Sequence, residues 1–187
     1  MDMTTNELPL KEDIQEVRIL SGIKPDHVED VLNLAAASGL FSSDLMMSAE
    51  DMAWDSAYGD GNESHVFLRA AINTSGAEKL VGFICFGPVL NWEGNYELYG
   101  IAVAPEFQRL GIGSALVAEM TRQITAEGGK RIYLETGDDR AFEGARLFYE
   151  ANDYVMEYRF LKHFIPTEGG VIYRYNIECE NIEPQYQ

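Results

Sequence analysis

The chain has 187 residues, 46% hydrophobic and 24% charged, which is the composition of a soluble globular protein with one core. Its 31 Asp and Glu outnumber 14 Lys and Arg, and the formal net charge of −17 disfavours nucleic acid and anionic membranes as partners. No apolar run approaches the ~20 residues of a membrane span, and the polar N-terminus is unlike a signal peptide. Cys85 and Cys179 fit neither a disulfide scaffold nor a metal site, so we expect a reducing cytoplasm and no bound metal.

Periodicity and turn residues predict one domain over residues 13–178, with a flexible leader over 1–12 and a flexible tail over 179–187. In chain order we first expect a strand over 15–20, a helix from Pro25 stopped by Gly39, and a helix capped by Ser43-Asp44 that reaches Tyr58. A linker over 59–64 then leads to a hairpin of 66–72 and 80–86 and to a strand over 97–103. The last elements are a helix after 113, a strand over 131–137, a helix over 141–152, and strands over 155–161 and 171–177. The chain therefore predicts a mixed α and β architecture.

The strand that ends at Val103 is followed by a loop, residues 108–114, with two glycines at the start of a helix. The uncovered amides and the dipole of that helix end attract a diphosphate, and Arg109 adds a fixed charge that suits phosphate oxygens. A dinucleotide-binding loop needs glycine or alanine where Leu116 stands, and a Walker loop needs a Gly-Lys-Ser/Thr end that is absent here. The remaining pattern is Q/R-x-x-G-x-G/A.

A second motif follows at the end of the last predicted helix, where Phe148-Tyr149 precedes Asp153-Tyr154. Together with the element order, the two motifs resemble the GNAT superfamily of acyl-CoA-dependent N-acyltransferases over roughly residues 15–178. Asp153 replaces the glycine usual in that family, and Asp tolerates the left-handed backbone of a helix end better than most residues. The resemblance implies an α+β fold with a central, mostly antiparallel sheet of about seven strands, splayed middle strands and flanking helices.

One group within the superfamily is similar in further segments, residues 39–42, 98–103 and 134–136, and consists of uncharacterised bacterial and archaeal acyltransferases. Those proteins usually carry an aromatic residue where this chain has Gly100. A glycine within a strand marks a bulge or admits a closely approaching backbone or ligand.

The resemblance also implies acetyl-CoA as the cofactor and an acetyl transfer to an amine. The pantetheine arm would pair with the strand edge at Ile101, Ala102 and Val103, as an added strand does. The diphosphate would lie on the loop formed by Gln108, Arg109, Leu110, Gly111, Ile112, Gly113 and Ser114. Because coenzyme A is an anion, Arg122 and Lys130 are further candidates for a local positive site.

The chemistry requires a base that takes a proton from the attacking ammonium and an acid that protonates the leaving thiolate. Glu97 is the first candidate for the base, and Glu135 at the end of the neighbouring strand is the second. If the two carboxylates line one cleft, their repulsion raises one pKa toward neutrality. Tyr149 matches the position of the family's usual acid. The three histidines share no pattern that indicates catalysis.

Phe41, Tyr99 and Phe164 are expected to form apolar walls of the acceptor site, while Glu97 and Glu135 attract a cation. An acidic cleft favours the primary amine of a small cationic molecule, with a protein lysine or N-terminus as the alternative. A second alternative is a non-catalytic module that binds acyl-CoA or another protein. The sequence also leaves open whether the protein is a monomer or a homodimer, and whether the −17 charge reflects habitat or substrate steering.

Overall fold

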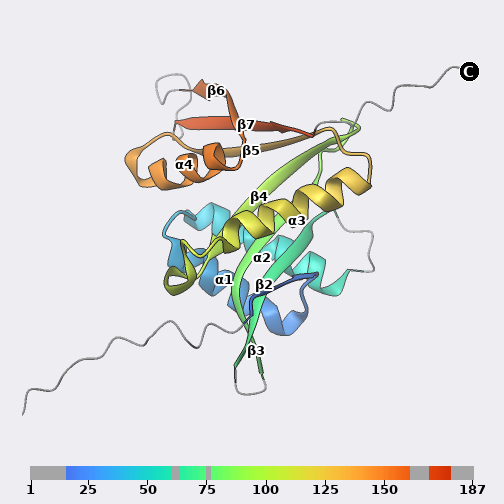
Figure 1. Ribbon diagram of the computed structural model, residues 1–187, viewed down its shortest axis with the longest axis vertical. Coiled ribbons are helices and arrows are strands. Elements are labelled where there is room, and N and C mark those ends of the chain that lie inside the picture. The colour runs from blue at the N-terminus through green and yellow to red at the C-terminus, as the bar shows by residue number, and fades with distance from the viewer. Residues whose placement is uncertain (1–15, 60–63, 75–76, 161–168, 178–187) are drawn as a thin grey trace, which may run out of the picture.

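The computed structural model describes residues 16–59, 64–74, 77–160 and 169–177 (Figure 1). The predicted leader and tail, and with them Cys179, lie outside this part of the chain, as do Phe164 and most of the 59–64 linker. The elements are β1 (Arg18–Ser21), α1 (Pro25–Ser38), α2 (Ser43–Tyr58), β2 (Val66–Thr74), β3 (Ala77–Pro88), β4 (Asn95–Val103), the 3₁₀ turn η2 (Pro105–Phe107), α3 (Ile112–Ala126), β5 (Arg131–Gly137), the 3₁₀ turn η3 (Arg140–Phe142), α4 (Glu143–Ala151), β6 (Val155–Phe160) and β7 (Gly170–Asn176).

The strands form one seven-stranded sheet in the order β1-β2-β3-β4-β5-β7-β6. Every neighbouring pair is antiparallel except β4 and β5, which are parallel. This mixed sheet with helices on both faces confirms the predicted fold class (Figure 1). Among the described helices, none is long and apolar enough to cross a bilayer.

Two apolar clusters hold the helices against opposite faces of the sheet. On one face, α1 and α2 bury Val31 and Ala53 against Phe67 and Phe83. On the other face, α3 contributes Leu116, Met120 and Ile124 to a cluster that also holds Tyr149 of α4, Leu68 of β2 and Ile84 of β3. Since strand side chains alternate between faces, the central strands β2, β3 and β4 contribute to both clusters.

The parallel pair β4 and β5 stays together for only three residues. Asn95 pairs with Arg131 and Glu97 with Tyr133, and beyond this last pair the two strands separate. β4 continues to Val103 and β5 to Gly137, so a gap opens in the middle of the sheet after Glu97 (Figure 1). This is the predicted splay.

A bulge interrupts β4 just beyond the point where the gap opens. Cys85 pairs with Gly100 and Phe86 with Leu98, which leaves Tyr99 as the extra residue. A Cβ on Gly100 would lie 3.2 Å from the Cζ atom of Phe41, so the glycine admits that ring. The bulge interpretation of Gly100 therefore holds, whereas the group that approaches it is a side chain of this chain and not another backbone or a ligand.

The ends of the elements agree with the sequence in most places. Gly39 ends α1 with a φ of 68°, and Asp153 has a φ of 64°, the left-handed backbone that was expected after α4. The cap of α2 was predicted one residue too late: Ser42 has the extended backbone of a cap, and its hydroxyl accepts a hydrogen bond from the Leu45 amide. The last helix was also predicted too early, because a 3₁₀ turn precedes Glu143.

Candidate active site

The loop between β4 and α3 has the backbone geometry of an anion site. Arg109 and Gly111 both have left-handed backbones, with φ of 63° and 83°. Gly111 caps α3 without offering a side-chain acceptor, so the first amides of the helix, from Ile112 to Ser114, have no partner within the helix. A Cβ on Gly111 would meet nothing within 4 Å, so the space beside this glycine is open. The loop fits a diphosphate.

Three residues of the loop have structural roles of their own. The Nε2 group of Gln108 donates to the carbonyl oxygen of Val103 at 3.0 Å and ties the loop to β4. Ile112 is buried in the core, and a Cβ on Gly113 would lie 3.0 Å from the ring of Phe148. Ile112 and Gly113 can therefore contact a cofactor only through their backbone, whereas Gln108, Arg109, Leu110 and Ser114 are exposed.

Alternate residues of β4 direct their backbone N–H and C=O groups toward the gap. The Ala104 amide donates to Val81 of β3, and by the two-residue alternation Ala102 also directs its backbone toward β3. Ile101 and Val103 then direct theirs toward the gap. Of the three residues predicted to pair with the pantetheine arm, Ala102 therefore does not fit, because its backbone hydrogen-bonding groups face β3 and not the gap.

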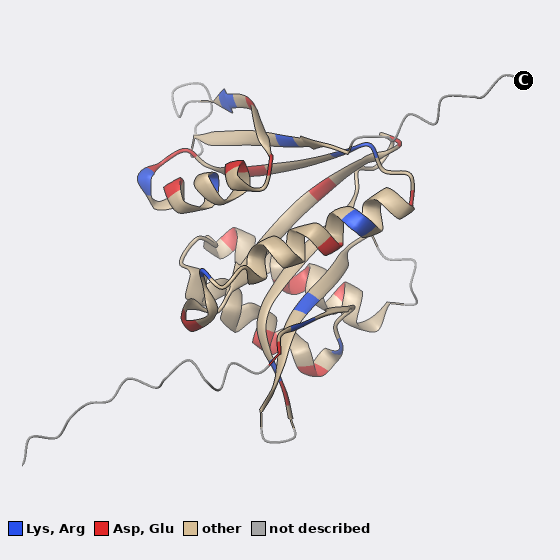
Figure 2. Cartoon of the chain, viewed as in Figure 1, with Lys and Arg blue, Asp and Glu red and all other residues tan. Residues whose placement is uncertain are grey.

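Arg122 and Lys130 do not lie at the loop. Arg122 is bound to Glu119 one turn earlier on α3, at 2.7 Å and 2.8 Å, and Lys130 packs beside Gly94. Charged residues of both signs are scattered over both layers (Figure 2). Arg109 is therefore the basic residue of this set that the structure places in the loop.

The two candidate carboxylates lie on either side of the gap. Glu97 is half-buried at the end of the β4–β5 pairing, and exposed Glu135 stands two residues beyond its partner on β5. Burial raises the pKa of Glu97, and the nearby charge of Glu135 raises it further. This is the direction expected for two carboxylates that share a site. Both side chains lie on the face of the sheet opposite the Leu98 and Leu134 core.

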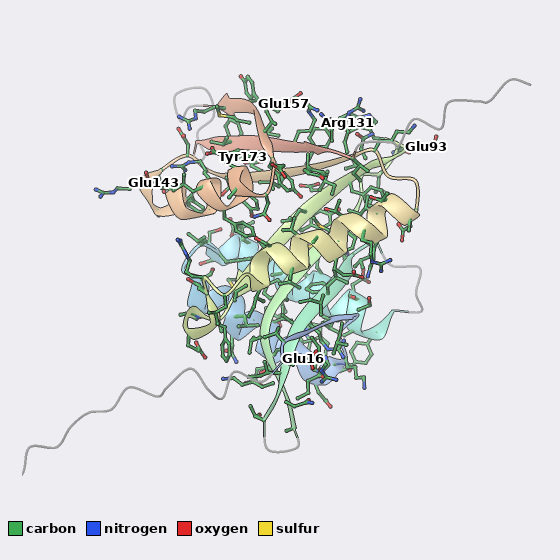
Figure 3. All side chains as sticks on the ribbon, viewed as in Figure 1. Glu16, Glu93, Arg131, Glu143, Glu157 and Tyr173 are labelled. Atoms are coloured by element: carbon green, nitrogen blue, oxygen red, sulfur yellow. The ribbon has the colours of Figure 1, made fainter. Side chains whose placement is uncertain are left out.

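Tyr149 reaches the sheet from the opposite face. It is 7% exposed and packs among Phe148, Tyr154 and Tyr173, with ring centroids 5.4, 5.8 and 6.1 Å away. Tyr173, labelled in Figure 3, reaches from β7 to the Glu150 carboxylate of α4 at 2.7 Å. Burial raises the pKa of Tyr149, so its hydroxyl keeps its proton.

The predicted acceptor walls are only partly brought together. Tyr99 is half-buried beside Glu97. Burial is the main cause that raises the pKa of Tyr99, and the charge of Glu97 raises it further. Phe41 covers Gly100, one residue further along β4. Sequence reasoning missed Tyr133, although its position two residues before Glu135 puts it on the same face. It also missed the buried hydroxyl of Tyr154, which has no partner among the described residues.

A groove of about 680 Å³ runs along α3 and lies apart from the two carboxylates. It is lined by Ser114, Val117, Ala118, Thr121, Arg122, Thr125, Ala126, Ala151, Asn152, Asp153 and Tyr175. Its lining is shared by α3, the end of α4 and β7, and it includes neither Glu97 nor Glu135. In the part of the chain that the structure describes, no cluster of three or more His, Cys, Asp or Glu is placed to hold a metal ion.

The sheet is thus splayed beside a glycine loop at the start of α3, and a carboxylate and a tyrosine lie on its opposite faces. The sequence matches the acetyltransferase (GNAT) family over residues 30–154, and the chain belongs to this family. It is therefore an acyltransferase. A search of curated proteins returned no match to the sequence.

Solved structures agree with this assignment. A GNAT-family protein from Desulfovibrio desulfuricans is 26% identical with a TM-score of 0.79, and the match covers 87% of this chain and 100% of that one. The ribosomal-protein-S18-alanine N-acetyltransferase of Escherichia coli is 20% identical with a TM-score of 0.65, covering 89% and 99%. The PaiA N-acetyltransferase of Thermoplasma acidophilum, solved with coenzyme A, is 18% identical with a TM-score of 0.66, covering 87% and 100%. The last two show the shared fold alone.

Proposed function

We propose that this acyltransferase moves an acetyl group from acetyl-CoA to the primary amine of a small cationic molecule. The observation that carries the proposal is the placement of Glu97, a carboxylate with a raised pKa at the point where β4 and β5 separate. A base with a raised pKa holds a proton more readily, which suits it to deprotonate an ammonium near neutral pH.

The gap and the loop supply the site for acetyl-CoA. The amides after Gly111 and the side chain of Arg109 would hold the diphosphate, and the β4 edge at Ile101 and the Val103 amide would pair with the pantetheine amides. The group supplies an activated thioester carbonyl and a thiolate leaving group. Backbone amides of β4 beside the gap would stabilise negative charge on the carbonyl oxygen.

The proton balance assigns different roles to the two faces of the sheet. An ammonium loses two protons when it becomes an amide. Glu97 would accept the first and release it to solvent. As the C–S bond breaks, the hydroxyl of Tyr149 would donate a proton to the sulfur, and the second proton of the amine, lost as the C–N bond forms, would restore this hydroxyl. Burial keeps this hydroxyl protonated, as an acid requires.

Charge favours a cationic acceptor. Glu97 and Glu135 attract a cation, and a protein with a net charge of −17 repels anionic acceptors. Solved relatives named as N-acetyltransferases of an alanine in ribosomal protein S18 and of an aminoglycoside share only the fold with this chain, but both act on amines. A protein lysine or N-terminus is the second candidate, and a binding module without turnover is the third. We expect a cytoplasmic monomer or homodimer.

Turnover with acetyl-CoA across small amines, peptides and anionic acceptors, followed with a thiol reporter at several ionic strengths, tests the proposal. A small cationic amine should give the highest kcat/KM. That value should fall as salt rises, because charges further apart than ~8–10 Å are largely screened at physiological ionic strength. Preference for an anionic acceptor would reject the proposed substrate class. No salt dependence with the best amine would assign the −17 charge to solubility.

A further inference from the structure

Glu97 lies in the middle of a row of residues that crosses the sheet. Its partners are Gly87 on β3 and Tyr133 on β5. Gly87 has no side chain, and the ring of Tyr99 lies beside it: a Cβ at this position would be 3.3 Å from the Cε2 atom of Tyr99 and would collide with the carbonyl oxygen of Ser64. Glu97 is thus flanked by one tyrosine ring toward β3 and by another on β5.

The two rings share the face that carries the candidate base. Ile132 and Leu134 are buried in the core beneath α3, so Tyr133 between them points to the opposite face. Tyr99 packs against the core beneath α1 and α2, which lies on that same opposite face. Glu135, two residues after Tyr133, also lies there, and its charge acts on Glu97.

Each tyrosine ring is supported from behind by another side chain. Trp92 stacks on Tyr133, with ring centroids 5.2 Å apart and an interplanar angle of 23°. His65 packs edge-on against Tyr99, also at 5.2 Å, and its Nδ1 atom lies 3.3 Å from the Oδ2 atom of Asp55 on α2. Rings held in this way lose little freedom when a ligand binds, which favours recognition.

We propose that Tyr99 and Tyr133 form an ammonium slot with Glu97 at its base, which selects an organic ammonium by cation–π attraction as well as by charge. The inference rests on the proposed function of the same site. Tyr133 is then a specificity-determining residue, while Trp92 and the Asp55–His65 pair are positioning residues that hold the two rings. Aromatic faces attract the charge of an alkylated nitrogen, and the carboxylate rejects anions.

The slot should prefer a cation over a neutral molecule of the same shape, and this preference does not depend on acetyl transfer. Choline has a quaternary nitrogen with no proton to lose, and 3,3-dimethyl-1-butanol has the same shape with carbon in place of nitrogen. Calorimetry on the full chain, with and without coenzyme A, compares the two probes. We expect choline to bind roughly ten times more tightly, which is within the range of a desolvated cation–π contact combined with a carboxylate.

Three substitutions assign the effect to the ring. Tyr133→Phe keeps the aromatic face and should preserve choline binding, whereas Tyr133→Leu keeps an apolar side chain and should weaken it roughly fivefold. Tyr58→Leu is the matched control, because Tyr58 also stacks on a tryptophan, Trp54, with ring centroids 5.6 Å apart, but on α2. If Tyr133→Leu does not fold, Trp92→Leu is the substitute, because it removes the ring that stacks on Tyr133. This variant should bind choline more weakly, while its affinity for the neutral isostere should not change.

Equal affinity for choline and its neutral isostere would overturn the slot, even in an active enzyme. An unchanged choline affinity in folded Tyr133→Leu, or in Trp92→Leu where that variant replaces it, would overturn it as well. A chain that binds choline through Tyr133 but transfers no acetyl group would contradict the proposed function and support the slot. The two proposals can therefore fail separately.

Discussion

Gly113 at the start of α3 lies against Phe148 of α4, where a Cβ would be 3.0 Å from the Cε2 atom of the ring. The second glycine of the loop is therefore required by helix packing, whereas Gly111 faces open space with a left-handed backbone. The two glycines of one motif thus have different physical reasons, and their substitutions should have different effects.

We expect Gly111→Asn to weaken coenzyme A binding while the fold survives, because Asn tolerates the left-handed region and its side chain enters the proposed diphosphate site. Gly113→Val should instead lower the free energy of unfolding by ~1–3 kcal/mol, as overpacking does. Urea unfolding and calorimetry with coenzyme A separate the two effects. Wild-type affinity in Gly111→Asn would contradict the placement of the diphosphate.

Tyr149 and Tyr154 offer a matched pair of buried hydroxyl groups. Tyr149→Phe should lower turnover by ~10²-fold, since it removes the proposed acid and keeps the ring. Tyr154→Phe should keep turnover and leave stability unchanged or raise it by up to ~1 kcal/mol, because it removes a buried hydroxyl without a partner among the described residues. Loss of turnover in Tyr154→Phe alone would move the acid role to that residue.

The acidic limb of the kcat/KM profile should report the interaction between the two carboxylates. Glu97 must be deprotonated to act as a base, and Glu135 raises the pKa of Glu97. Glu135→Gln therefore lowers this pKa and should move the acidic limb to lower pH. Glu93→Gln, a change at an exposed glutamate in the turn before β4 (Figure 3), is the control. A limb that stays in place would mean that the two carboxylates do not interact.

Glu97→Gln should lower the activity and raise the stability of the protein. Turnover should fall by ~10²- to 10⁴-fold, the range of one acid–base group. Since the folded pKa of Glu97 lies above its unfolded value, burial of its charge opposes folding at neutral pH, and this penalty disappears as pH falls through the folded pKa and below. The variant should unfold at higher urea concentration at pH 7, with a smaller difference at acidic pH. A constant difference would contradict the raised pKa.

Phe41 and Gly100 should be coupled. Gly100→Phe alone collides with Phe41, and Phe41→Ala alone leaves a space over the strand. The double variant returns one aromatic ring to this place from the strand, so its stability should exceed the sum of the single effects by ~1 kcal/mol or more. Urea unfolding of the four proteins measures this coupling, and the KM for the acceptor shows whether the ring borders the site. Additive effects would mean that the two positions are independent.

The sequence by itself determined the features that depend on neighbouring residues. Alternation and turn residues predicted the strands and helices within a few positions, and Asp153 could be assigned a left-handed backbone because few residues other than glycine tolerate one. The two glycines at the start of α3 predicted an anion site from the chemistry of a helix end alone. Together with the Phe148-Tyr149 motif and the element order, this pattern was enough to predict the fold.

Only the tertiary structure decided what meets across the sheet. The register of β3, β4 and β5 places Tyr133 beside Glu97 and leaves room for Tyr99 next to Gly87, and a shift of one residue would turn these side chains to the other face. No local pattern reports that Gln108 binds back to Val103 or that Gly113 faces Phe148. Such contacts join segments that local propensity treats as independent, because they depend on the packing of the whole sheet.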